Sequence, residues 1–85
     1  MRLTLKAAKE VLRRQRMSIT SRDREYRVTF DKTWDMTAQD REGCAYYTDD
    51  LQDAMTTGCH MAAEQSARAK EELLRAYVRE VLKLV

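Results

Sequence analysis

The stretch MSITSRDREYRVTF, residues 17–30, decides the fold. In its first half, the apolar residues Met17 and Ile19 alternate with polar ones. In its second half, every second position is aromatic or β-branched: Tyr26, Val28 and Phe30. A period of two with such residues is typical of strands, so the stretch predicts a β-hairpin around a short polar turn. The turn contains neither Asn-Gly nor Asp-Gly, which leaves its type open.

A helix is predicted before the hairpin. Residues 3–16 carry apolar side chains at helical spacing, and Thr4 stands where an N-cap is expected. Basic residues recur on the opposite face in steps of three and four: Arg2, Lys6, Lys9, Arg13 and Arg16. This helix is therefore expected to have one buried face and one strongly positive face.

Two further elements are predicted after the hairpin. Residues 31–43 are mostly polar and acidic, and we interpret them as a long connection. Residues 44–47 predict a third short strand, completing an antiparallel meander. Thr48, Asp49 and Asp50 then open a helix, because a hydroxyl caps free N–H groups and carboxylates suit the positive end of the helix dipole.

The predicted fold class is α+β, with the order α-β-β-β-α. A three-stranded antiparallel sheet is expected to carry both helices on one face. The C-terminal helical segment is expected to be long or bent. The predicted core residues are Leu5, Ala8, Leu12, Ile19, Tyr26, Val28, Phe30, Tyr46, Leu51, Met55 and Ala62.

The C-terminal segment is too long for the domain. One helix over residues 48–84 would measure about 55 Å, whereas the radius of gyration of a compact domain of this size is ~12 Å. Either the chain bends near residues 64–66, or the second half pairs with another chain. We favour a homodimer, in which residues 1–63 form the core and residues 64–85 form a helical extension of the same domain. The interface residues expected on this extension are Leu74, Tyr77, Val78, Val81 and Val85.

The bulk composition excludes several classes of protein. With 85 residues the chain forms one domain, and its two glycines cannot build a phosphate-binding loop. No apolar run approaches the ~20 residues that span a bilayer, and the N-terminus lacks the apolar region of a signal peptide. The expected location is the cytoplasm, without membrane association, where both cysteines stay thiols.

The residues that could support catalysis or metal binding are few. His60 and Cys59 are adjacent on a helix and therefore point about 100° apart, which does not make a nucleophile–base pair. Cys44, Cys59 and His60 lack the close cysteine pair of a structural zinc site. The aspartates around residue 50 do not follow a calcium-loop pattern. We expect no catalytic residue, no metal, no cofactor and no enzymatic activity.

Charge is distributed unevenly along the chain. Residues 1–30 hold nine basic and three acidic residues, whereas residues 31–72 hold four basic and ten acidic ones. A positive surface of this kind binds nucleic acid or an acidic protein partner. The candidate binding residues are Arg2, Lys6, Lys9, Arg13 and Arg16 of the helix, with Arg24 and Arg27 of the hairpin.

An apolar pair, Trp34 and Met36, stands in the acidic connection. Trp34 either folds back over one end of the sheet or is an exposed anchor for a protein partner. Together, these features predict a small non-enzymatic protein-binding module that self-associates and has an unidentified protein partner. The alternative is a nucleic-acid-binding protein that uses the basic face of the first helix and the hairpin.

Two resemblances bear on this prediction. The order of elements over residues 3–63 is similar to the double-stranded-RNA-binding-like fold of HicA-type toxin ribonucleases. Those toxins carry a catalytic histidine in a Gly-Ser-His segment of the second strand, but the matching residues 24–28 contain none, so the resemblance implies the layout and not the activity. Residues 12–15 with the Tyr-Arg-Val strand, and residues 45–54, resemble short uncharacterised proteins of bacterial phages and prophages. That resemblance implies a regulatory or host-interaction role.

Overall fold

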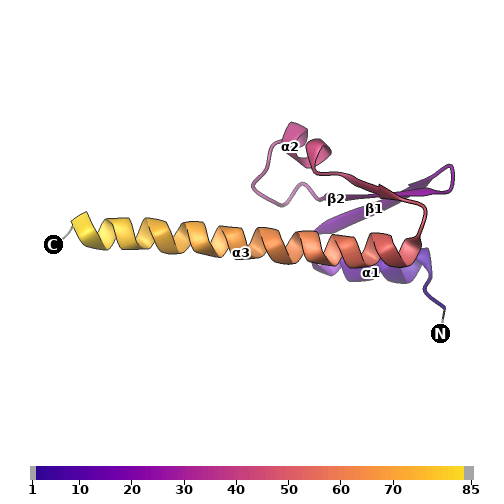
Figure 1. The fold of residues 1–85 in the computed structure, drawn as a ribbon, viewed down its shortest axis with the longest axis horizontal. Helices are drawn as coiled ribbons and strands as arrows, with labels where there is room; N and C mark the ends of the chain where they lie inside the picture. Colours follow the sequence, from indigo (N-terminus) through magenta and orange to yellow (C-terminus); the bar gives the residue numbers. More distant parts are fainter. Residues whose placement is uncertain (1, 84–85) are drawn as a thin grey trace.

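The computed structural model describes residues 2–83 and has an α+β fold (Figure 1). An antiparallel sheet of order β1-β2-β3 carries α1 and α3 on one face, and α2 lies on the other side. The elements are α1 (Leu5–Arg14), β1 (Met17–Arg22), β2 (Glu25–Phe30), α2 (Ala38–Gly43), β3 (Tyr46–Thr48) and α3 (Leu51–Lys83). The predicted fold class and the α-β-β-β-α order of the main elements are confirmed, with α2 as an addition.

The hairpin of β1 and β2 forms where the alternating pattern predicts it. Met17 pairs with Phe30, and Arg22 pairs with Glu25. Between them, Asp23 and Arg24 both adopt positive φ, 52° and 64°. Two such residues in a two-residue loop make a type I′ turn, whose twist matches that of the flanking strands. The turn therefore uses this conformation without the glycine that usually supplies it.

The core lies between the sheet and the two helices. Leu12 of α1 and Val28 of β2 are fully buried. Gly58 of α3 faces both, and a Cβ atom there would lie 2.6 Å from Leu12 Cδ2 and 3.0 Å from Val28 Cγ1. The absence of a side chain at this position therefore lets α3 approach α1 and the sheet closely. Of the predicted core, Ala8, Leu12, Ile19, Val28, Phe30 and Ala62 are buried, while Leu5, Tyr26, Tyr46, Leu51 and Met55 are half-buried.

Three sequence-based boundaries need correction. The connection over residues 31–43 contains the helix α2, whose N-cap Thr37 accepts a hydrogen bond from the backbone N–H of Asp40. The third strand begins two residues later than predicted, because Val28 and Tyr26 of β2 pair with Tyr46 and Thr48. The first helix is shorter than predicted and ends at Arg14.

The C-terminal segment is one continuous helix, α3, of 33 residues. Asp50 caps its start, since the Asp53 backbone N–H donates to Asp50 Oδ1 at 3.1 Å, while Thr48 accepts from the Asp50 N–H instead. The helix extends well beyond the sheet (Figure 1), and the radius of gyration is 16.2 Å, against about 12 Å for a compact domain of this length. The chain does not bend near residues 64–66. Within residues 2–83, no helix combines the length and apolar character needed to cross a membrane.

Candidate functional site

The second half of α3 has no packing partner within the described chain. The last side chains of α3 that are partly covered are those of Gln65 and Ser66, and every residue from 67 to 83 is exposed. We call residues 67–83 the free half of α3. Among residues 2–83, eight large hydrophobic side chains are exposed, and six belong to the free half, with exposures from 40% to 72%. These six form the apolar strip: Leu73, Leu74, Tyr77, Val78, Val81 and Leu82.

The apolar strip faces away from the sheet. The first half of α3 packs through Ala54, Gly58 and Ala62, which share one face at four-residue spacing. At about 100° per residue, Leu74 and Val78 lie roughly 160° around the helix axis from Gly58, the middle of that face, whereas Leu73 at the edge of the strip lies about 60° from it. The centre of the strip is therefore not a continuation of the face that contacts the sheet, and a partner would approach from the other side of α3.

The centre of the strip has the spacing of a helix-pairing seam. Leu74, Val78 and Val81 are separated by steps of four and three. Charges of both signs stand outside the strip, and within the helix Arg75 pairs with Glu71 at 2.8 Å. Val85, the remaining predicted interface residue, lies outside the described residues.

Trp34 and Arg16 hold the connection after β2 against the end of α1. The Trp34 indole N–H donates to the Arg16 carbonyl oxygen at 2.7 Å, and its ring meets Phe30 edge to face at 5.4 Å between centroids. The Arg16 guanidinium stacks 4.4 Å from the Trp34 ring centroid and donates to Thr33 Oγ1. Trp34 and Met36 are half-buried against the core. Arg16 adopts φ of 63° beyond the helix end, so it does not lie on the basic face of α1.

The remaining basic candidates occupy two surfaces rather than one. Lys6, Lys9 and Arg13 are exposed on α1, which covers one face of the sheet. Arg27 lies on the opposite face, because strand residues alternate and its neighbour Val28 faces α3. Arg24 stands in the hairpin turn. The single positive surface expected from helix and hairpin together is therefore divided by the sheet.

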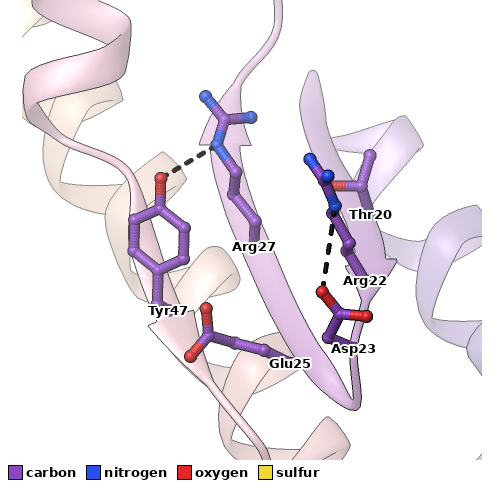
Figure 2. Close-up of a pocket in the computed structure, with 6 residues that line it drawn as sticks. All are labelled: Thr20, Arg22, Asp23, Glu25, Arg27 and Tyr47. Atoms are coloured by element: carbon purple, nitrogen blue, oxygen red, sulfur yellow. Dashed lines mark hydrogen bonds and ion pairs between the residues drawn. The ribbon is translucent and has the colours of Figure 1, made fainter.

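The open face of the sheet carries a shallow depression of about 600 Å³. Figure 2 shows Arg27 directed toward Tyr47 and Arg22 toward Asp23, with Glu25 nearby. Arg27 donates to the Tyr47 hydroxyl at 3.3 Å and pairs with Glu42, and the hydrogen bond with Tyr47 is the main reason that its pKa is raised. Since acidic side chains balance the arginines and Arg27 is already engaged, the depression shows no preference for an anion or a cation.

Tyr46 and Asp53 form a polar contact between β3 and α3. The Tyr46 hydroxyl donates to Asp53 Oδ2. This bond is the main reason that the pKa of Asp53 is lowered from 3.8 and that the pKa of Tyr46 is raised from 10.0. The contact therefore stabilises the fold while Asp53 is ionised.

We expect Asp53→Asn to weaken the acid dependence of stability. The lowered pKa means that ionised Asp53 contributes stability above pH 3.8, and that this contribution is lost as the pH falls through the lower pKa of the folded state. Wild type should therefore be more stable than the variant at pH 7, and the difference should shrink below pH 4. Urea titrations across this pH range measure the difference, with Asp49→Asn as the control. If the free energy of unfolding of Asp53→Asn and of wild type fell by equal amounts as the pH is lowered from 7 to below 4, this prediction would be contradicted.

Few residues of the described chain could support catalysis or metal binding. Cys44 is exposed and Cys59 is half-buried, and both are free thiols. Gln15 donates to Cys59 Sγ at 3.2 Å, which links α1 to α3. Within residues 2–83, no three His, Cys, Asp or Glu side chains cluster closely enough to hold a metal ion. The exposed free half of α3 is therefore the strongest candidate site.

Comparison with protein-family models, curated proteins and solved structures found no match. The resemblances to HicA-type toxins and to phage proteins therefore stay expectations.

Proposed function

We propose that this protein is a non-enzymatic protein-binding module that self-associates through the free half of α3. The observation that carries the proposal is the apolar strip, which gathers six of the eight exposed large hydrophobic side chains of residues 2–83 on the half of α3 that has no packing partner in the described chain. Exposed apolar patches of this kind mark interaction sites. An amphipathic helix also depends on packing of its apolar face for most of its stability in water.

A second copy of the chain is the partner that the strip fits best. The alternating spacing of Leu74, Val78 and Val81 lets an identical helix interlock with it. A two-fold dimer needs only this one self-complementary surface. Charges of both signs on the rest of the free half limit repulsion between copies. In a reducing cytoplasm, the proposed location, Cys44 and Cys59 would remain thiols and take no part in the pairing.

The proposal is tested by light scattering of the full chain over a dilution series. We expect a dimer that dissociates on dilution. Leu74→Glu should weaken the dimer by about 100-fold, because a loss of about 1.4 kcal/mol at each copy enters the symmetric interface twice. The matched control is Ala76→Glu, which adds the same charge to an exposed position on the other side of the helix.

Two outcomes would overturn the proposal. One is a monomer at every concentration with an unchanged circular dichroism spectrum. The other is an equal loss of dimer in Leu74→Glu and Ala76→Glu, since added charge rather than the apolar strip would then explain both. Circular dichroism of each variant confirms that the core remains folded, and the substitutions lie outside that core.

A further inference from the structure

We propose that the exposed basic face of α1 binds the phosphate backbone of nucleic acid. This face consists of Lys6, Lys9 and Arg13, with Arg2 just before the helix, and we call it the α1 basic stripe. The inference goes beyond self-association, because the stripe lies on α1 and the apolar strip lies on the free half of α3, where the helix has passed the sheet (Figure 1).

The fold presents the stripe outward. Ala8 and Leu12 bury the inner face of α1. At about 100° per residue, Lys6, Lys9 and Arg13 share an arc of roughly 60° on the exposed side. From Lys6 to Arg13 the stripe spans about 10 Å, which corresponds to about three nucleotides along one strand of a duplex.

The charges of the stripe are available to a ligand. Residues 2–16 contain six basic residues and one acidic residue, Glu10. Within the described chain, no ion pair involves Lys6 or Lys9. Arg13 pairs with Glu10 at 2.8 Å, but both side chains are exposed, and surface pairs of this kind exchange readily for another anion.

The composition of the stripe favours phosphate over a protein partner. A protein interface needs an apolar or aromatic centre, whereas binding to a phosphate backbone needs charge alone. Val11 is the exposed large apolar residue of α1, and it points roughly 150° away from the stripe. The four positions of the stripe are all basic. An acidic protein would therefore find charge here but no anchor.

The test is fluorescence anisotropy of labelled duplex DNA and duplex RNA with the full chain, over about 50 to 200 mM salt. We expect the logarithm of the association constant to fall with the logarithm of the salt concentration, with a slope of about −3.6 for the four basic residues of the stripe. The variant Lys6→Gln/Lys9→Gln/Arg13→Gln should reduce that slope by about 2.7 and weaken binding at low salt at least tenfold. Binding to both duplexes indicates backbone contacts alone, and binding to one identifies which nucleic acid is bound.

The matched control is Arg22→Gln/Lys32→Gln/Arg79→Gln, which removes the same charge from exposed positions outside the stripe. It should leave the slope nearly unchanged. Equal losses of affinity in both triple variants would overturn the proposal, and so would the absence of binding at low salt. Binding of polyglutamate, which represents an acidic protein, without binding of either duplex would overturn it as well. Leu74→Glu should bind nucleic acid with the same salt slope as wild type. A failure of self-association can therefore be distinguished from a failure of nucleic-acid binding.

Discussion

Replacing Gly58 by leucine will lower the free energy of unfolding by about 3 kcal/mol or more. Even the first carbon of the new side chain would lie 2.6 Å from Leu12 Cδ2 and 3.0 Å from Val28 Cγ1. Both neighbours are fully buried and cannot swing into solvent. Removing glycine from a helix stabilises it by about 1 kcal/mol, which is too little to offset the displacement of α3 from the sheet.

The chain supplies its own control for this substitution. Gly43 also lies in a helix, but nothing lies within 4 Å of the position that its Cβ would take. Gly43→Leu should therefore change stability by less than about 1 kcal/mol. Urea denaturation of both variants measures the difference. A similar loss at both positions would show that the side chain itself, and not close packing of α3, causes the effect.

The elements that sequence reasoning predicted well are those with a local pattern. The hairpin follows from alternation at Tyr26, Val28 and Phe30, and its register places all three on the helix-facing side. The sequence leaves open whether the C-terminal segment bends, and the continuity of α3 agrees with the absence of proline and the strong helix propensity of its second half. In both cases, neighbours in the sequence determine the structure.

The elements that it missed depend on distant residues or weak signals. The helix α2 has six residues and no buried side chain, so no apolar period marks it. Its one local sign is Thr37, three residues before Asp40, which is the spacing of an N-cap. The bounds of β3 are set by its pairing with β2, and a strand of three residues has little pattern of its own.

The candidate sites show the same division. The apolar strip could be predicted because one helix holds all of its residues. The basic candidate residues could not be predicted to lie on two separate surfaces, because it is the packing of α1 on β1 that places Arg13 and Arg27 on opposite sides of the sheet. The spacing of the basic residues predicts Arg16 on the helical face, but a residue with φ of 63° ends that face, and its guanidinium stacks on Trp34.

Replacing Leu12 by alanine will lower the free energy of unfolding by about 2–5 kcal/mol. Leu12 is fully buried where α1, β2 and α3 meet, so the lost side chain leaves a cavity that its neighbours cannot close. For 85 residues, the total stability is about 4–13 kcal/mol, and the variant therefore loses a large part of it. Val11→Ala is the control, because the adjacent side chain is partly exposed and its truncation should cost less than about 1 kcal/mol.

The double variant Leu12→Ala/Gly58→Leu should be more stable than the sum of the two single changes predicts. The atom that Gly58→Leu would displace first is Leu12 Cδ2, which Leu12→Ala removes. The new leucine would then fill space that the smaller residue leaves open. We expect a coupling of at least about 1 kcal/mol in a double-mutant cycle measured by urea denaturation. Additive losses would show that Val28, 3.0 Å from the same position, and not Leu12, limits the approach of α3.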